Sequence, residues 1–221
     1  MSQKNFLVIG GSRGIGKSLV ELLEGSGHCV FSTSSQTYKA GGDSLPIPEN
    51  IVLHGLAYCP GSIQLVPFTR ISETHFQEEM HLNTYGALKA TQLALPFLKK
   101  ADHASIVYFS TVAVQTGMPF HASVAMTKGA IEGLARSLAA ELAPKIRVNA
   151  IAPSLTHTDL AEKFVNSSDK KEAAGKRHPL QRIGESQDIA AAAHFLLQSE
   201  SSWITGQIIH VNGGIGQLKL L

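Results

Sequence analysis

Residues 6–16 read FLVIGGSRGIG, a short apolar run followed by a turn that holds four glycines. An unbroken apolar run is typical of a strand covered on both faces, so Phe6–Ile9 is predicted as a strand. The residues from Gly14 to about Gly25 have helical spacing, and Cys29–Thr33 predicts a second strand. Strand, helix and strand form a βαβ unit that crosses over right-handed into a parallel sheet.

The rest of the chain continues this alternation. Further strands are predicted at Gly55–Cys59, Ser105–Ser110, Arg147–Ile151 and Ile208–Val211. Helices are predicted at Ser72–Leu98, bent or broken within its length, at Ala122–Leu142 and at Ser186–Leu197. The pattern predicts an α/β fold, a doubly wound parallel sheet of the Rossmann type, in a single domain over residues 1–221. Gln36–Asn50, with two prolines and a Gly-Gly pair, is predicted as a loop.

Composition excludes several classes of protein. A chain of 221 residues buries a core without disulfides or metal, and 43% apolar with 16% charged residues excludes wholesale disorder. A net charge of +2 gives no support for nucleic-acid binding. No apolar run approaches the ~20 residues of a membrane span, and no signal sequence opens the chain. Cys29 and Cys59 lie in apolar runs, which predicts two buried thiols and a reducing, cytoplasmic compartment. No metal site is predicted.

The glycine turn is a candidate phosphate site. Gly10, Gly14 and Gly16 let the backbone turn tightly and approach a pyrophosphate, while the helix N-terminus supplies N–H donors. A glycine pattern alone is weak, but here it follows a strand and opens a helix, which is the context that a dinucleotide site requires. A glycine-rich turn with only a structural role is the alternative.

The end of the second predicted strand indicates which dinucleotide binds. An NAD site usually has an acidic residue there, for the ribose 2′-hydroxyl. Residues 32–36 read STSSQ, without an acid, and Arg13 lies inside the glycine loop. A guanidinium and the absence of a carboxylate both favour a 2′-phosphate, so NADP(H) is predicted. In the alternative interpretation Arg13 is a solvated loop residue.

Several segments resemble motifs of the short-chain dehydrogenase/reductase family, in the family's order and over nearly the whole chain. Residues 10–16 resemble TGxxxGIG, with Ile9 in place of Thr, and residues 58–61 (YCPG) resemble NNAG but keep only the Gly. Residues 147–154 (RVNAIAPS) resemble RVNxIxPG, and residues 178–184 and 204–214 resemble the C-terminal signature. Within this family, the sequence most resembles the 3-oxoacyl-carrier-protein reductases.

One segment departs from this resemblance. Between the second strand and the YCPG segment the family has room for a helix, a strand and another helix, whereas this chain has about twenty residues. A shortened or missing helix–strand unit is therefore predicted, which leaves the adenine contacts at that edge unassigned.

The resemblance also implies a mechanism. In the family, hydride passes between the nicotinamide C4 and a carbonyl carbon while a Tyr transfers the proton, assisted by a Lys, a Ser and an Asn. Asn83, in the segment NTYG, matches the Asn, Lys128 matches the Lys, and Thr111 takes the Ser position. The Tyr position is Val124, and a valine cannot transfer a proton. Losing a general acid typically costs about 10²–10⁴-fold in rate.

Other groups are candidates for the missing donor. His121 lies seven residues before Lys128, which resembles the Tyr-x6-Lys spacing of the divergent enoyl-acyl-carrier-protein reductases. The alternative is a histidine that only flanks the following helix. Tyr108 lies in a predicted strand and is expected in the core. For Tyr85, on the helix that holds Asn83, the sequence leaves open whether the side chain points inward or outward. A water held by Asn83 and Lys128 is a further candidate, and Lys128 alternatively serves only to hold the nicotinamide ribose.

The resemblance and the glycine turn together assign the cofactor contacts. The predicted contact residues are Gly10, Ser12, Arg13, Gly14, Ile15, Gly16, Thr33, Ser34, Ser35, Pro60, Gly61, Lys128, Pro153, Thr156 and Thr158. His157 is expected to be an exposed loop residue. Residues 160–176 are polar with a helical pattern, and in the family such an insert covers the substrate pocket.

The sequence therefore predicts an NADP(H)-dependent oxidoreductase that acts on a small-molecule carbonyl or acyl substrate, or on an activated C=C bond. A catalytically weak or inactive NADP(H)-binding protein and a structural protein without cofactor are the alternatives. The helix that holds Lys128 is rich in small residues, and the resemblance implies a homodimer or homotetramer through it. Burial of that face inside the monomer is the other interpretation.

Overall fold

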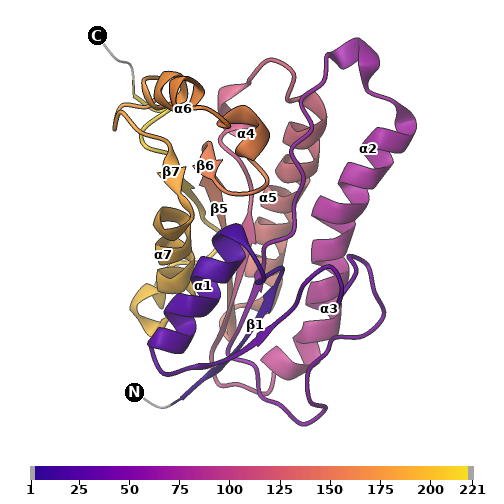
Figure 1. Cartoon of the computed structure of the whole chain (residues 1–221). Helices are drawn as coiled ribbons and strands as arrows, with labels where there is room; N and C mark the ends of the chain where they lie inside the picture. The colour runs from indigo at the N-terminus through magenta and orange to yellow at the C-terminus, as the bar shows by residue number, and fades with distance from the viewer. Residues whose placement is uncertain (1–2, 219–221) are drawn as a thin grey trace.

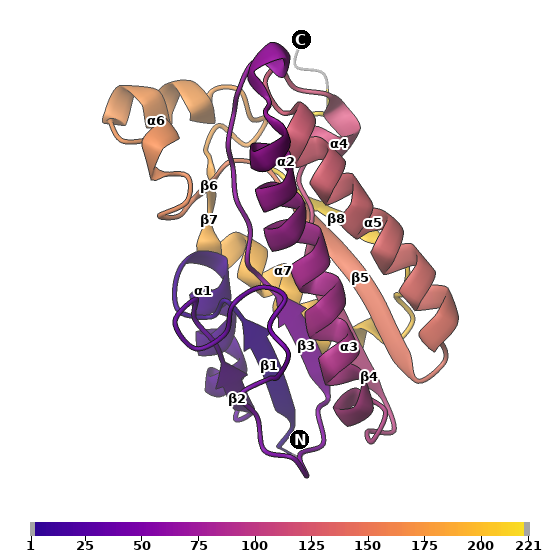
Figure 2. The ribbon, with the colours of Figure 1, turned by 90° about the vertical axis from the view of Figure 1, so that its right-hand side faces the viewer.

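The computed structural model describes residues 3–218 and shows a six-stranded sheet in the order β2-β1-β3-β4-β5-β8, with every neighbouring pair parallel. The strands are β1 Asn5–Ile9, β2 Cys29–Ser32, β3 Gly55–Tyr58, β4 Ala104–Phe109, β5 Ile146–Pro153 and β8 Ile208–Val211. Figure 2 shows the strands side by side, with helices before and behind them. The predicted doubly wound α/β fold is confirmed.

Helices cover both faces of the sheet (Figure 1). One layer holds α1 Gly14–Gly25 and α7 Ser186–Leu197, and the other holds α2 Glu73–Met80, α3 Gly86–Leu98 and α5 Ala122–Leu142. In β1 the side chains alternate between the layers: Phe6 and Val8 pack with the α1 and α7 core, and Leu7 and Ile9 pack with the α3 and α5 core. Burial on both sides explains why this strand is apolar at successive positions.

Most of the shorter elements lie at the carboxyl ends of the strands, whereas the turn directly after α7 lies at the opposite end of the sheet, beside Arg147. The shorter elements are η1 Phe68–Arg70, α4 Ala113–Thr116, β6 Thr156–His157, η3 Glu162–Phe164, α6 Ser168–Gly175, β7 Gly184–Glu185 and η4 Ser199–Ser201. In Figure 1, α4, α6 and the small β6–β7 sheet lie above the main sheet. Residues 160–176 are thus helical in their second half and contain only a 3₁₀ turn in the first.

The predicted break within residues 72–98 is a π turn, η2 His81–Tyr85, which continues from α2 and leads directly into α3. Cys29 and Cys59 are free thiols, as predicted, but the prediction that both are buried is wrong, because each is only partly buried. Cys29 starts β2, the edge strand of the sheet, and Cys59 follows β3 at a cavity. No helix within residues 3–218 is both long and apolar enough to cross a membrane.

The predicted loss of a helix–strand unit after the second strand is confirmed. No helix or strand lies between Ser32 and Gly55, and β2 is the edge of the sheet. The segment that replaces the missing unit is fixed by two contacts to the α2–α3 helix. His81 Nε2 donates to the Ala40 carbonyl at 3.0 Å, and the Lys89 ammonium pairs with Asp43 at 3.1 Å.

Arg147 fastens the end of α7 to the sheet. Its guanidinium donates to the carbonyls of Leu196 at 2.9 Å, Gln198 at 3.0 Å and Ile204 at 3.2 Å. The last carbonyls of a helix have no partner within the helix, and the guanidinium adds a charged donor to neutral ones such as Ser105 Oγ on Leu196 and Asn149 Nδ2 on Ile204.

We expect Arg147→Met to lower the free energy of unfolding by about 2 kcal/mol, since it leaves these carbonyls without their charged donor. Urea titration followed by circular dichroism measures the change. The control is Lys17→Met, because Lys17 is exposed and pairs with the equally exposed Glu21, four residues later. That variant should stay within about 0.5 kcal/mol of the wild type. Equal effects in both variants would contradict the role assigned to Arg147.

Candidate active site

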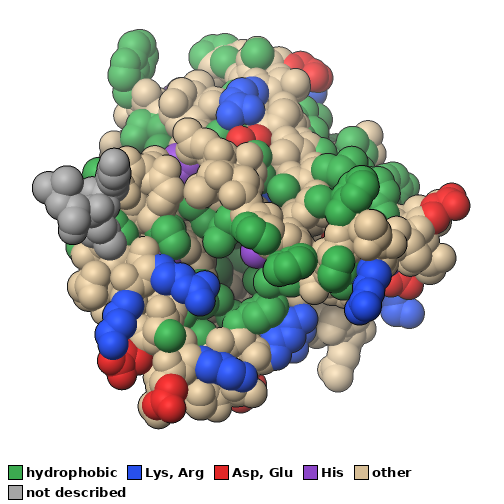
Figure 3. Space-filling model, turned by 90° about the horizontal axis from the view of Figure 1, so that it is seen from above, with side chains coloured by type: hydrophobic (Ala, Val, Ile, Leu, Met, Phe, Trp, Pro, Cys, Tyr) green, Lys and Arg blue, Asp and Glu red, His purple; other side chains and the backbone are tan. Residues whose placement is uncertain are grey.

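Two adjoining cavities lie at the carboxyl ends of β1, β3 and β4. The first measures about 400 Å³ and the second about 460 Å³, and Ile15, Cys59, Gly61, Thr158 and Leu160 line both. Figure 3 shows the hollow from above, with apolar side chains inside it and Lys or Arg side chains around it. Ligands of open parallel sheets bind at this edge, outside the carboxyl ends of the strands.

The glycine turn forms one wall of the first cavity and depends on backbone that only glycine adopts easily. Gly10 has φ +78° and Gly14 has φ +52°. A Cβ on Gly16 would lie 2.2 Å from the Gly10 carbonyl oxygen, so helix α1 begins in direct contact with the turn. Thr33 fixes the turn from β2: its hydroxyl accepts from Gly10 N at 3.2 Å, and its carbonyl accepts from Gly11 N at 2.9 Å. This cradle fits a dinucleotide pyrophosphate.

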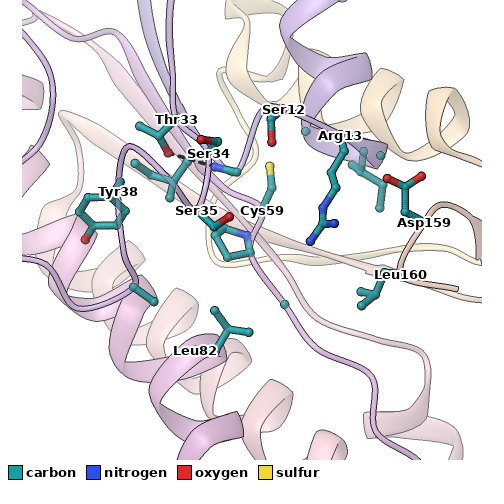
Figure 4. Close-up of a pocket in the computed structure, with 18 of the residues that line it drawn as sticks. Ser12, Arg13, Thr33, Ser34, Ser35, Tyr38, Cys59, Leu82, Asp159 and Leu160 are labelled. Carbon is teal, nitrogen blue, oxygen red and sulfur yellow. Dashed lines mark hydrogen bonds between the residues drawn. The ribbon is translucent and has the colours of Figure 1, made fainter.

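The first cavity gathers most of the predicted cofactor residues. It is lined by Gly10, Ser12, Arg13, Gly14, Ile15, Gly16, Thr33, Ser34, Ser35, Pro60, Gly61 and Thr158. Figure 4 shows the Arg13 guanidinium extending into this space, with Ser34 and Ser35 on the opposite side. Their roles as cofactor contacts stay predictions.

Sequence reasoning missed several residues of this cavity, namely Ile9, Tyr38, Lys39, Ala40, Cys59, Leu82, Asp159 and Leu160. Tyr38, Lys39 and Ala40 belong to the segment that replaces the missing helix–strand unit. The shortness of this segment in the sequence was the signal that could have indicated these cavity residues, because a short connection must pass close to the strand ends. Lys39 adds a second cation to the cavity beside Arg13, and Asp159 is the carboxylate that lines it.

The second cavity is mostly apolar, with walls that include Ile63, Leu65, Met118, Leu155 and Phe164. Of the predicted residues, Thr111, His121, Lys128, Pro153 and Thr156 line it. Val124 lines it too and is only 3% exposed. Lys170 in α6 and Arg177 just after it add two cations to the lining beside Lys128, so α6 lies against this cavity, as the resemblance implied for the 160–176 insert.

Lys128 lines the second cavity, beside Cys59 and Gly61, which line both cavities. Its Nζ donates to the Phe109 carbonyl at 2.9 Å, and a Cβ on Gly61 would lie 3.2 Å from that nitrogen. Burial lowers the pKa of Lys128 to about 8, although Cys59 and Glu79 oppose the shift. The ammonium is therefore close to its titration range near neutral pH.

Asn83 does not line either cavity and is fully buried within the π turn. Its Nδ2 donates to the Glu79 carbonyl at 2.9 Å and to Ser62 Oγ at 3.0 Å. Its Oδ1 accepts from Ser62 N at 3.4 Å. Ser62 itself lines the second cavity, so Asn83 reaches the cavity through that serine.

No tyrosine lies on the second cavity within residues 3–218. Tyr108 is fully buried, as expected, and its hydroxyl bonds Thr91 at 2.6 Å. Tyr85 points outward and is 47% exposed, while the Tyr58 hydroxyl donates to the Leu82 carbonyl at 2.7 Å. The fourth tyrosine, Tyr38, belongs to the first cavity. No phenol therefore replaces the one absent at Val124.

His121 immediately precedes α5 and is half-buried at the second cavity. Its Nδ1 lies 2.7 Å from the Pro119 carbonyl, which can only accept, so Nδ1 carries a proton. Nε2 then has a proton to give only when the ring is an imidazolium. His157 is exposed, as expected, and contacts Glu185.

The doubly wound parallel sheet and its glycine cradle define a dinucleotide-binding protein of the Rossmann type. A family model described as enoyl-(acyl carrier protein) reductase matches residues 49–216. The chain is 30% identical to a tropinone reductase homologue of Arabidopsis thaliana, over 97% of this chain and 92% of that protein. It is also 30% identical to the 3-oxoacyl-[acyl-carrier-protein] reductase FabG of Aquifex aeolicus, over 95% and 96%. The chain belongs to the short-chain dehydrogenase/reductase family of oxidoreductases.

Solved structures are similar over the same extent. The ligand-free aldohexose dehydrogenase of Thermoplasma acidophilum superposes with a TM-score of 0.88 at 26% identity, covering 99% of this chain and 96% of that one. A small-chain dehydrogenase in complex with NADPH superposes with a TM-score of 0.86 at 28% identity, covering 99% of this chain and all of the other.

We expect Gly16→Ala to abolish measurable dinucleotide binding, because the new methyl group would collide with the Gly10 carbonyl and displace α1 from the turn. Fluorescence titration with NADPH measures the loss, and thermal unfolding shows whether the fold persists. Gly133→Ala in α5 is the control, since its Cβ would meet no atom within 4 Å. Wild-type affinity in Gly16→Ala would show that the dinucleotide binds elsewhere.

Proposed function

We propose that the protein is an NADP(H)-dependent oxidoreductase that transfers hydride between this cofactor and a carbonyl or activated C=C substrate without the family's tyrosine. The adjacency of the two cavities beside Lys128 is the observation that supports the proposal most strongly. One cavity fits a dinucleotide, and the other offers an apolar space where the reactive ends of cofactor and substrate meet.

Preference for NADP(H) is supported by charge. No acidic residue follows β2, whereas Arg13 and Lys39 line the same cavity as Ser34 and Ser35. Two cations and several hydroxyls suit a 2′-phosphate, and a carboxylate that would repel it is absent from the strand end. The structural neighbour that holds NADPH supports the same choice.

We expect the protein to bind NADPH at least about tenfold more tightly than NADH, and Arg13→Ala to remove most of this difference. Cofactor fluorescence titrations at fixed ionic strength measure both dissociation constants. Lys17→Ala is the control, because Lys17 is an exposed cation of α1 that pairs with Glu21 outside the cavity. NADH binding as tight as NADPH binding in the wild type would refute the role of Arg13.

The bound cofactor supplies the hydride, and the side chains around the second cavity perform the remaining tasks. Thr111 offers a hydroxyl that orients the substrate oxygen. Lys128 holds the nicotinamide ribose and places a positive charge beside the reacting oxygen, where developing negative charge is stabilised. The apolar walls exclude water, which strengthens these electrostatic contacts.

The substrate cavity favours an apolar carbonyl compound that also has an acidic group. Its interior is apolar, and among residues 3–218 its lining includes the cations Lys128, Lys170 and Arg177 and no Asp or Glu. Phenylglyoxylate, which combines a ring, a ketone and a carboxylate, and the neutral 1-phenyl-1,2-propanedione are suitable probes. Reduction of the first at a higher kcat/KM than the second is expected.

A catalytically quiet NADP(H)-binding protein is the second candidate, and Val124 is the observation that favours it. Positioning and electrostatics persist without the phenol, but the general acid does not. NADPH binding without turnover of either probe would support this candidate over the enzyme.

Restoring the phenol tests the scaffold directly. We expect Val124→Tyr to raise kcat for ketone reduction by about 10²–10⁴-fold, because Val124 lines the cavity beside Thr111 and Lys128. NADPH oxidation followed at 340 nm measures the gain. Val124→Phe, which adds the ring without the hydroxyl, is the matched control. Equal rates in the two variants would mean that the hydroxyl is not placed to react.

The assembly is proposed to be a homodimer or homotetramer. The outward side of α5 exposes Met126, Gly133 and Ala140, while Ile131 and Leu142 of the same helix are buried in the monomer. The helix therefore leaves part of its small-residue face outside the core. Sedimentation equilibrium determines the oligomeric state.

The two free cysteines support a second proposal, that the protein works in a reducing, cytoplasmic compartment.

A further inference from the structure

Glu79 is a buried carboxylate close to the site of the missing phenol. It lies in α2, four residues before Asn83, and its residue is only 1% exposed. Its two oxygens are bound from different sides. Ser62 Oγ donates to Oε1 at 3.3 Å, and Ser123, the residue directly before Val124, donates to Oε2. A buried carboxylate is costly unless it is hydrogen-bonded or paired, and His75, 3.6 Å away, is a partner that can supply a positive charge.

Ser62 connects this carboxylate to the substrate. The serine lines the second cavity together with Thr111, Val124 and Lys128. Its hydroxyl accepts from Asn83 Nδ2 at 3.0 Å while it donates to Glu79, so both contacts of the side chain hold the oxygen in place. A hydroxyl has one proton and two acceptor lone pairs, which is what a relay group needs.

His75 connects the carboxylate to the outside. Its Nε2 lies 3.6 Å from Glu79 Oε2 and has no hydrogen-bond partner among the described residues. The side chain is 15% exposed, one turn before Glu79 on the same helix. Cavity, serine, carboxylate and imidazole therefore follow one another toward the surface of α2, joined by a hydrogen bond between Ser62 and Glu79 and by a longer 3.6 Å step between Glu79 and His75.

We infer that Ser62 delivers the proton in this enzyme and that Glu79 and His75 resupply it from solvent. As hydride reaches the carbonyl carbon, the substrate oxygen takes the Ser62 hydroxyl proton. Before this transfer the His75 imidazolium protonates Glu79, directly after a side-chain rotation or through one water, which frees the Ser62 proton to turn toward the substrate. The Glu79 carboxylic acid then returns its proton to the Ser62 oxygen. The products are the alcohol, the restored serine and carboxylate, and a neutral His75 that solvent protonates again.

The geometry favours Ser62 over His121 as the donor. The Ser62 hydroxyl is held by two side chains and contacts a carboxylate that can resupply its proton, whereas the described hydrogen bond of the His121 side chain is to the Pro119 carbonyl, which cannot resupply one. Glu79 is a positioning and relay group in this assignment, since it reaches the substrate only through Ser62.

The inference rests on the proposed oxidoreductase function and is tested on the full-length protein with phenylglyoxylate and NADPH. We expect Ser62→Ala and Glu79→Gln each to lower kcat by about 10- to 100-fold, with KM and NADPH affinity within about twofold of the wild type. Because proton delivery becomes limiting, the solvent deuterium isotope effect on kcat should rise in both. Ser62→Thr keeps the hydroxyl and should restore most of the rate.

Glu132 provides a matched control. This second buried glutamate accepts from Ser110 Oγ at 2.8 Å, and Ser110 also lines the second cavity. Its carboxylate is paired with Arg136 at 3.3 Å, and among the residues that the structure describes no histidine is paired with it as His75 is with Glu79. Glu132→Gln should retain the wild-type kcat and isotope effect. A loss in Glu132→Gln as large as that in Glu79→Gln would overturn the inference, because any buried carboxylate would then have the same effect.

A measurement without turnover completes the test. In the free protein at fixed pH, the NMR chemical shifts of the His75 ring should change in Glu79→Gln, because the two side chains lie 3.6 Å apart, and stay unchanged in Glu132→Gln. Wild-type kcat in Ser62→Ala together with loss of activity in His121→Phe would overturn the path and assign the donor to His121. NADPH binding without any turnover by the wild type would instead refute the proposed oxidoreductase function, and the path with it.

Discussion

Parallel pairing of β1, β3 and β4 is the constraint on which the site depends. Parallel strands bring their carboxyl ends to one edge, so the residues that follow each strand meet there although they are far apart in sequence. Gly10 follows β1, Cys59 follows β3 and Ser110 follows β4. Any shift of register in one of these ladders would separate the glycine cradle from the groups of the second cavity. The apolar side chains that cover both faces of the sheet hold that register.

The strands and long helices could be predicted because each has a single strong pattern. Phe6–Ile9 is apolar at every position since helices cover both sides of β1, and Ala122–Leu142 forms the helix that its spacing predicts. The π turn at His81–Tyr85 could not be predicted, because a break in periodicity does not say how the backbone continues. The half-exposed state of Cys59 also escaped prediction, since it depends on a cavity and not on the apolar run around it.

Residues of the candidate site were predictable where their roles follow from backbone motifs. The glycine turn and the residues after β5 lie on the cavities as expected, while Tyr38 and Lys39 entered through a connection whose path no local pattern specifies. Glu79 and Ser62 are similar cases. Each looks ordinary in the sequence, and only the packing of α2 against α5 places Glu79 beside Ser123. Contacts between segments distant along the chain are the part that a sequence pattern does not determine.

The loop that replaces a helix–strand unit after β2 has a consequence for how such folds change. Each strand of a parallel sheet enters with its own crossover, so the outermost unit can be deleted without altering the pairing of the strands that remain. The deletion turns β2 into a border whose outer backbone groups face no further strand. A doubly wound domain can therefore be shortened from its rim inward, and the ligand-binding centre survives because it lies at the middle strands.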